Sequence, residues 1–147
     1  MSIFPTKILL ALDGSEEASS AARMAVELAG RTDSELHVVH VGEVAPVYHP
    51  ERHGYLARYE ELQEQARRLL DEQVDKVESA GGIVARAHLR MGRPDAEIVV
   101  LGEELGAGLI VTGSRGLGGM RRALMGSVSE SVVHHASCPV LVVRKEE

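Results

Sequence analysis

The stretch Leu109–Val128 reads L-I-V-T-G-S-R-G-L-G-G-M-R-R-A-L-M-G-S-V and combines a strand, a glycine-rich loop and a helix start. A short β-branched run ends at Gly113, further glycines follow at positions 116, 118, 119 and 126, and a helical pattern begins at Ser127. Glycine lets a ligand approach the backbone closely, and the free N–H groups at a helix start bind anions. This order of elements predicts a loop that holds phosphate.

The charge of this loop supports the same prediction. Arg115, Arg121 and Arg122 are the only ionisable residues between Leu105 and Ser129, in a chain whose formal net charge is -6. Guanidinium groups form paired hydrogen bonds with planar anions such as phosphate. For these three side chains, direct contact with phosphate and plain solvation remain the two alternatives.

Apolar runs and helical patterns alternate along the whole chain. The runs predict strands at residues 7–12, 35–41, 83–89, 109–112 and 140–144. Helices are predicted from Ser15 to a stop at Gly30, from 59 to a stop at Gly81, from Pro94 to a stop at Gly106 and over 127–136, with a loop at 42–54. Such alternation predicts an α/β fold with right-handed crossovers. We expect one domain over residues 1–147, an open twisted five-stranded parallel sheet of order 3-2-1-4-5 with helices on both faces, which is a Rossmann-like arrangement.

Three residues mark the carboxyl ends of predicted strands, namely Asp13, Val41 and Gly113. Ligands of open parallel sheets bind beyond these ends, where the strand order reverses, so Asp13 and the glycine loop are expected to face one crevice. Asp13 has an alternative role as a turn residue that bonds its own backbone. Ser127 also begins an S-x-x-E capping-box pattern with Glu130, which still leaves the Ser127 N–H for phosphate.

Composition and charge exclude several classes of protein. The net charge of -6 argues against a general nucleic-acid role, and no apolar run reaches the length of a membrane span. The single Cys138 forms no internal disulfide, which is typical of a reducing compartment. We therefore expect a cytoplasmic protein without nucleic-acid or membrane partners. His37 and His40 are three apart on a strand and point to opposite faces, so we expect no metal site there.

Neither of two common phosphate-binding motifs is present. The chain has no G-x-x-x-x-G-K-[ST] and no G-x-G-x-x-G after a strand. Instead, Gly113, Gly116, Gly126 and Ser127 form G-x2-G-x9-G-[ST] after a strand. This spacing resembles the universal stress protein family, specifically its ATP-binding branch. The resemblance covers essentially the whole chain, from K-I-L-L-A-L-D-G-S near the start to C-P-V-L-V-V near the end.

The resemblance implies a ligand and a set of contacts. The implied cofactor is ATP, with Mg²⁺ as an open addition. Asp13 would contact the adenine or ribose side, and Val41 would meet adenine through its backbone. The phosphates and ribose would be surrounded by Gly113, Gly116, Gly126, Ser127 and Val128, and Arg115 joins this set because of the charge of the loop. One departure is Gly108, where the family often has Asp before the fourth strand.

Three functions compete. The leading hypothesis is an ATP-binding stress-response or signalling module that acts as a nucleotide-dependent sensor or regulator, with no catalytic residue. The alternative is a slow ATP hydrolase, or a nucleotide or phosphoryl transferase, that uses the same pocket. Rapid phosphoryl transfer needs a held metal and a residue that positions the nucleophile, and the sequence offers only Asp13 for Mg²⁺ and no credible general base. A nucleotide-free interaction protein is the third hypothesis, and the intact glycine pattern argues against it.

The carboxyl-terminal strand predicts a homodimer. Val140–Val143 is apolar on both faces, yet the order 3-2-1-4-5 places this strand at the edge of the sheet, with one row of backbone groups unpaired. We expect two such strands to pair antiparallel across a two-fold axis, as the resemblance also implies. The alternative is that the tail folds back or a helix covers this edge.

Overall fold

The computed structural model describes residues 2–44, 54–114 and 126–145. In this part of the chain the strands are β1 (Lys7–Ala11), β2 (Glu35–Glu43), β3 (Val84–Gly92), β4 (Leu109–Gly113) and β5 (Val140–Val143). The helices are α1 (Glu16–Thr32), α2 (Tyr55–Ser79), α3 (Pro94–Leu105) and α4 (Ser127–His135). The alternation of strands and helices matches the sequence prediction.

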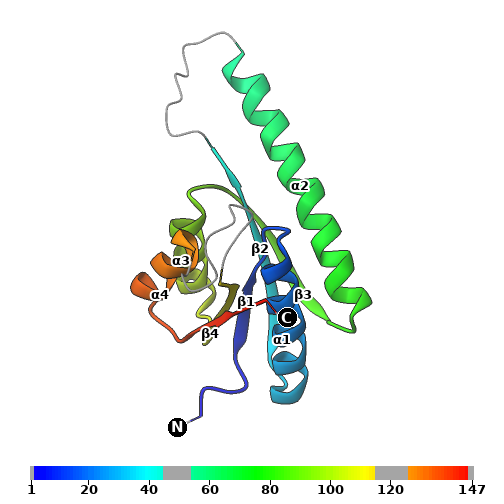
Figure 1. Cartoon of the computed structure of the whole chain (residues 1–147), viewed down its shortest axis with the longest axis vertical. Helices are drawn as coiled ribbons and strands as arrows, with labels where there is room; N and C mark the ends of the chain where they lie inside the picture. The colour runs from blue at the N-terminus through cyan, green and yellow to red at the C-terminus, as the bar shows by residue number, and fades with distance from the viewer. Residues whose placement is uncertain (1, 45–53, 115–125, 146–147) are drawn as a thin grey trace.

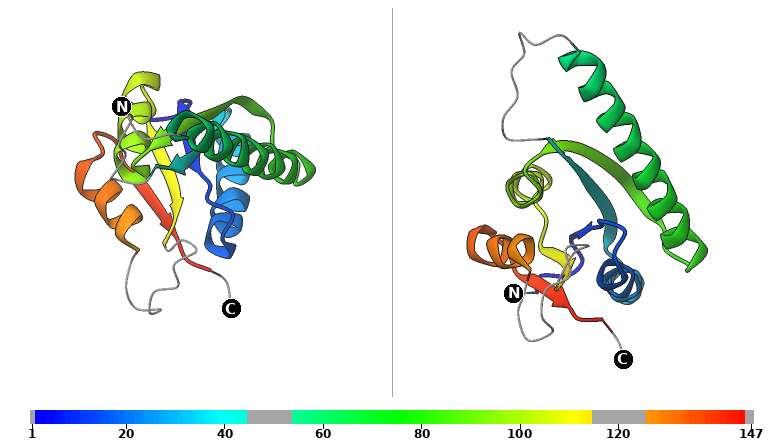
Figure 2. Two further views of the ribbon diagram at one scale, coloured as in Figure 1. Left: turned by 90° about the horizontal axis from the view of Figure 1, so that it is seen from above. Right: turned by 45° about the horizontal axis from the view of Figure 1, so that its top comes forward.

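All neighbouring strands are parallel, and the sheet has the order β3-β2-β1-β4-β5. Helices α1 and α2 lie on one face of the sheet, and α3 and α4 lie on the other (Figures 1 and 2). The predicted α/β fold and its strand order are therefore confirmed.

Two apolar cores separate the sheet from its two helical layers. Successive side chains of a strand point to opposite faces, so Ile8 and Leu10 of β1 belong to the core under α1 and α2, and Leu9 belongs to the core under α3 and α4. All three are 0% exposed. A central strand buried on both faces explains why this segment of the sequence is a continuous apolar run.

Helix α1 begins as predicted and ends later. The Ser15 hydroxyl accepts a hydrogen bond from the Ala18 N–H at 3.1 Å and caps the first turn. The predicted stop at Gly30 is wrong, because the helix continues to Thr32 and Asp33 adopts the left-handed cap with φ 56°. A glycine inside a helix costs only about 1 kcal/mol, and Asp is among the residues that tolerate the left-handed region.

Three other predicted boundaries are also wrong. Helix α2 begins at Tyr55 rather than at 59. Leu56 in its first turn is 68% exposed, so packing against the core does not mark the start of this helix. Strands β2 and β3 extend past their predicted ends because they pair with each other up to Glu43 and Gly92. The predicted 42–54 loop therefore begins later, and its residues 45–53 lie outside the described part of the chain.

The longer β2 has a consequence for the site. Strand β1 stops pairing with β2 at Ala11, opposite Val39, so β2 projects beyond the end of its central neighbour. Backbone groups of β2 that face β1 lose their ladder partners there. This step in the sheet forms one wall of the cleft described below.

The histidines of β2 contact different partners. His37 Nδ1 lies 3.1 Å from His88 Nε2 of β3, and the two rings stack, whereas His40 Nδ1 lies 2.8 Å from the main-chain oxygen of Leu12. Within the described residues, no group of three His, Cys, Asp or Glu side chains is placed to hold a metal ion.

Burial raises the pKa of the Cys138 thiol. None of the described helices has the length and apolarity needed to cross a membrane.

Candidate functional site

A cleft of about 520 Å³ opens at the carboxyl ends of β1, β2 and β4. This size is within the range of roughly 300–1,000 Å³ typical of small-molecule sites. Its position is the point at which the strand order reverses, where ligands of open parallel sheets bind. The cleft is lined by strand-end residues, by the first turns of α1 and α4, by one residue of α2 and by two residues of α3: Ala11, Leu12, Asp13, Ser15, Ala18, Val39, His40, Val41, Gly42, Glu43, Leu69, Pro94, Ile98, Thr112, Gly113, Gly126, Ser127, Val128 and Ser129.

The cleft brings together most of the residues predicted from the sequence. Six of the eight predicted site residues line it, namely Asp13, Val41, Gly113, Gly126, Ser127 and Val128. The other two, Arg115 and Gly116, lie outside the described residues, as do Arg121 and Arg122. Predicted site residues as far apart in the sequence as Asp13 and Val128, 115 positions, thus line the same cleft.

At the β2 end, the backbone of Val41 faces the cleft. The Val39 oxygen accepts the Leu12 N–H at 2.9 Å, so the backbone groups of Val39 point toward β1. Backbone groups two residues apart point the same way, and those of Val41 therefore also point toward β1, which has already ended. Among the described residues, no β1 group takes them up. Val41 thus offers one donor and one acceptor side by side.

At the β4 side, the first turn of α4 lines the cleft, and its first N–H groups have no main-chain partner among the described residues. Gly126 is the N-cap, and the Gly126 oxygen accepts the first helical bond from the Glu130 N–H at 3.0 Å. The N–H groups of Ser127, Val128 and Ser129 precede that bond and have no partner inside the helix. A helix start of this kind favours a bound anion.

The predicted capping box at Ser127 does not form. Gly126 holds the cap position, so Ser127 is already the first residue of the helix, and its side chain is exposed. Instead, the buried Ser129 hydroxyl lies 2.8 Å from the Ser114 oxygen and 3.1 Å from the Gly126 oxygen. The Gly126 N–H also donates to the Ser114 oxygen at 2.7 Å. These bonds fix the start of α4 to the residue that follows β4.

A sequence model of the universal stress protein family matches residues 5–144 of this chain. The chain belongs to this family. Universal stress protein YxiE of Bacillus subtilis is 35% identical over 147 residues, with 94% of this chain and 98% of the relative covered. A universal stress protein of Methanocaldococcus jannaschii is 36% identical over 140 residues, covering 95% and 82%. The solved structure of UspA from Lactobacillus plantarum is similar, with a TM-score of 0.83, 26% identity and coverage of 96% and 99%.

Asp13 in this universal stress protein takes the role of a turn residue. Its Oδ1 accepts the Ser15 N–H at 2.9 Å, which is the alternative that the sequence left open. The side chain still lines the cleft and is partly exposed. The turn bond uses one carboxylate oxygen, so turn formation and ligand contact are compatible at this residue.

Two glycines of this universal stress protein have packing partners that the sequence did not reveal. A Cβ on Gly113 would lie 2.8 Å from the Glu17 carbonyl carbon and 3.0 Å from the Ala18 nitrogen, so the first turn of α1 rests directly on the end of β4. A Cβ on Gly108 would lie 2.9 Å from the Thr6 Cβ. The departure from Asp at position 108 therefore coincides with close packing against Thr6.

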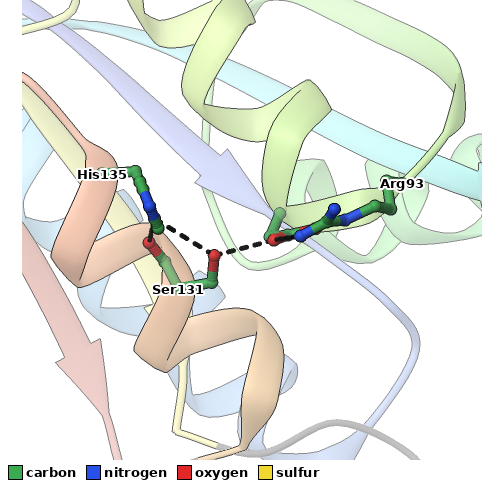
Figure 3. A network of polar contacts seen from close by, with 4 residues as sticks. Arg93, Ser131 and His135 are labelled. Atoms are coloured by element: carbon green, nitrogen blue, oxygen red, sulfur yellow. Dashed lines mark hydrogen bonds and ion pairs between the residues drawn. The ribbon is translucent and has the colours of Figure 1, made fainter.

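A polar network joins α3 to α4 beside the cleft (Figure 3). Arg93 donates two hydrogen bonds to the Asp95 carboxylate, from Nε at 3.0 Å and from Nη2 at 2.8 Å. The Ser131 hydroxyl donates to Asp95 Oδ2 at 2.7 Å, and His135 Nδ1 lies 2.8 Å from the Ser131 oxygen. Asp95 is the centre of this network, and it ties the start of α3 to the helix whose first turn lines the cleft.

Asp95 predicts a pH-dependent contribution to stability. Hydrogen bonds from Arg93 and Ser131 hold the pKa of the Asp95 carboxyl well below its usual range, against a smaller effect of burial. A carboxyl whose pKa is lower in the folded state stabilises it above the unfolded pKa, near 3.9, and loses this contribution as the pH falls further. We expect Asp95→Asn to lower the urea midpoint at pH 7, and the difference from wild type to shrink below about pH 4. A constant difference between pH 7 and pH 3 would contradict this assignment.

Five polar residues of the cleft were not predicted as site residues from the sequence: Ser15, His40, Glu43, Thr112 and Ser129. The hydroxyls of Ser15 and Ser129 form hydrogen bonds with backbone groups. Thr112 was predicted only as a strand residue. His40 had a usable signal, because it is polar, stands next to Val41, and occupies the end of a predicted buried strand. The prediction for His40 concerned metal binding alone.

Proposed function

We propose that this universal stress protein binds an adenine nucleotide, ATP, in the cleft and acts as a nucleotide-dependent sensor or regulator. The observation that carries the proposal is the complementary pair of ends in one cleft. Val41 presents an adjacent donor and acceptor that suit the edge of a base, and the start of α4 presents N–H groups that suit phosphate. Strands β2 and β4 are separated by β1, so the two ends are about 10 Å apart, at roughly 4.8 Å per strand.

The walls between the two ends suit a nucleoside. Apolar side chains of Leu12, Val39, Leu69 and Ile98 line the cleft together with the carboxylates of Asp13 and Glu43. An apolar wall with a small number of placed polar groups is typical of cofactor sites. A carboxylate that lies between the base end and the phosphate end suits ribose hydroxyls, and Asp13 at the end of β1 has this position.

Two solved universal stress proteins of the same fold have adenine nucleotides bound. One is in complex with cAMP, at 22% identity and a TM-score of 0.74, and one from Archaeoglobus fulgidus is in complex with dAMP, at 24% identity and a TM-score of 0.60. At these identities the likeness to this chain is one of fold. These ligands belong to those proteins, and the proposal for this chain rests on its own cleft.

Mass spectrometry of small molecules released from natively purified protein tests the proposal and identifies the nucleotide. We expect ATP or its hydrolysis products to be released on denaturation, in an amount that rises with the amount of protein. A ligand without a base and a phosphate would contradict the proposal. The proposal would also be contradicted if the protein is purified without ligand and takes up no ATP when the nucleotide is added.

Hydrolysis of the bound ATP is expected to be slow or absent. Rapid phosphoryl transfer needs a residue that positions the attacking water near the last phosphate. Of the described residues lining the cleft, those with ionisable side chains are Asp13, His40 and Glu43, which lie on β2 or just after β1 rather than on β4 or α4. We expect a turnover well below about 10 per second, the typical value for enzymes. If steady-state phosphate release reached about 10 per second and were lost on changing Asp13, the protein would be an enzyme.

We also propose a homodimer through β5. This strand pairs with β4 alone among the described strands, and its residues are mostly half-buried. The Pro139 oxygen accepts the Ile110 N–H at 3.0 Å, and the Val143 oxygen accepts the Ser114 N–H at 2.8 Å. The backbone groups of every second residue of this segment therefore face β4. The backbone groups of Leu141 therefore also face β4, and those of Val140 and Val142 face away from it. Outward groups on an apolar edge strand favour pairing with a second copy.

Proline substitution tests the dimer without breaking the sheet. Val142→Pro removes an outward N–H and leaves the bonds between β4 and β5 in place. We expect wild type to be dimeric at tens of micromolar in light scattering, and Val142→Pro to have half that mass. Leu141→Pro would instead remove an inward donor and lower the stability of the fold. A monomeric wild type, or a Val142→Pro variant that stays dimeric, would contradict pairing through β5.

A further inference from the structure

His40 is a buried histidine of the cleft and has one hydrogen bond to the described residues. It precedes Val41 on β2, is 8% exposed, and lines the cleft. Its Nδ1 lies 2.8 Å from the main-chain oxygen of Leu12. A carbonyl oxygen only accepts, so Nδ1 carries the hydrogen, and the neutral ring has its lone pair on Nε2. The protein thereby fixes both the orientation and the tautomer of this ring.

The second ring nitrogen, Nε2, is left for a ligand. In the described part of the chain, no buried side-chain nitrogen or oxygen lacks a hydrogen-bond partner. The described residues offer Nε2 no partner, so this atom is not buried, and the open space beside His40 is the cleft. The charged groups that line the cleft with it, Asp13 and Glu43, are carboxylates that accept rather than donate. His40 Nε2 therefore presents a free acceptor of fixed direction.

The Val41 N–H next to His40 is also without a ladder bond to β1 among the described residues. In a regular parallel ladder the Leu12 oxygen would accept the Val41 N–H, because the Leu12 N–H already donates to the Val39 oxygen. The Leu12 oxygen lies against His40 Nδ1, and the Val41 N–H has no main-chain partner among the described residues. The Val41 N–H and the ring of its neighbour His40 therefore belong to the same end of the cleft, and both residues line it.

We propose that His40 recognises the nucleoside half of the ligand, with Nε2 accepting a hydrogen bond from a nucleoside donor. This inference rests on the nucleotide site proposed above. His40 lies on β2, and α4 begins beyond β4, two strands away, so His40 addresses the nucleoside rather than the phosphates. A nucleoside has two kinds of donor that fit an acceptor here, the exocyclic amine of the base and the ribose hydroxyls. The chemistry is the same for both, and the experiment distinguishes them.

The substitution His40→Asn separates the two ring nitrogens. An asparagine amide can still donate to the Leu12 oxygen, but it lacks an acceptor at the position of Nε2. Calorimetry would measure four nucleotides against wild type and variant: ATP, inosine triphosphate without the amine, 2′-deoxy-ATP and 3′-deoxy-ATP. His134→Asn is the matched control, because His134 lies at the end of α4 with its side chain 69% exposed. We expect it to bind all four nucleotides as wild type does.

We expect His40→Asn to weaken ATP binding about tenfold, the usual effect of losing one hydrogen bond. One analogue should bind wild type about tenfold more weakly than ATP does and lose nothing further in the variant, which identifies the donor. Wild-type binding of ATP with an unchanged His40→Asn affinity would overturn this inference alone. Failure of wild type to bind ATP would overturn the nucleotide site as well.

A measurement on wild type covers the case in which the variant is unfolded. Nitrogen-15 spectra of the His40 ring follow Nε2 directly. We expect the Nε2 signal to move upfield when ATP is added, as it does when a lone pair accepts a hydrogen bond, with Nδ1 still protonated. An Nε2 signal that stays in place while ATP binds would overturn the proposal.

Discussion

Gly126→Val is expected to abolish ATP binding and to leave the fold unchanged. Gly126 is buried, lines the cleft and precedes the N–H groups of Ser127 and Val128. Because Gly126 lines the cleft, we expect a valine side chain there to take up space that phosphate needs to reach these groups. The backbone itself accommodates valine, because φ -68° and ψ 159° are in the extended region. We expect the affinity to fall at least a hundredfold, about 2.7 kcal/mol.

The control for this experiment is Gly30→Ala. Gly30 is an exposed residue of α1, and a Cβ there would meet nothing within 4 Å. Calorimetry should give wild-type affinity for this variant, and far-UV circular dichroism should be the same for all three proteins. If Gly126→Val binds ATP as tightly as wild type, the first turn of α4 does not hold the phosphates.

Gly113→Ala is expected to destabilise the protein by about 1–3 kcal/mol, the cost of adding a methyl group to a filled space. The added Cβ would lie 2.8–3.0 Å from backbone atoms of Glu17 and Ala18. Backbone atoms of a capped helix do not move aside as the end of a flexible side chain does. Because the shift would also displace the capped start of α1, which lines the cleft, ATP binding should weaken too.

Gly30→Ala gives the opposite sign for the same chemical change. An alanine inside a helix is more favourable than a glycine by about 0.5–1 kcal/mol, and there is open space around Gly30. Urea unfolding of both variants measures the contrast. Equal and small effects would show that α1 does not rest on the end of β4 as closely as these distances indicate.

The arrangement of strands could be predicted because the determining signals are local. A continuous apolar run such as residues 7–12 identifies a buried parallel strand, and glycines mark the ends of most elements. Boundaries failed where packing decides them. Gly30 lies inside α1 because the helix tolerates it, and β2 extends to Glu43 because β3 extends with it.

The site was predicted in outline because its residues follow strand ends and a recognisable glycine spacing. What the sequence did not contain was the direction of hydrogen bonds. S-x-x-E at Ser127 matches a capping box, yet the chain enters the helix one residue earlier, at Gly126. Gly113 was expected to admit a ligand, and its nearest neighbours are in α1. The role of His40 depends on the Leu12 oxygen, 28 residues away in the sequence.

Titration of nitrogen-15-labelled protein with ATP, followed through its backbone amide signals, tests most directly whether the nucleotide occupies this cleft. We expect the amide signals of Val41 at one end and of Ser127 and Val128 at the other to move together with a single affinity. Amides of the amino-terminal half of β3, on the opposite edge of the sheet from β5, should stay in place. A saturating ATP concentration that moves none of these cleft amides, or moves only residues outside the cleft, would contradict the account.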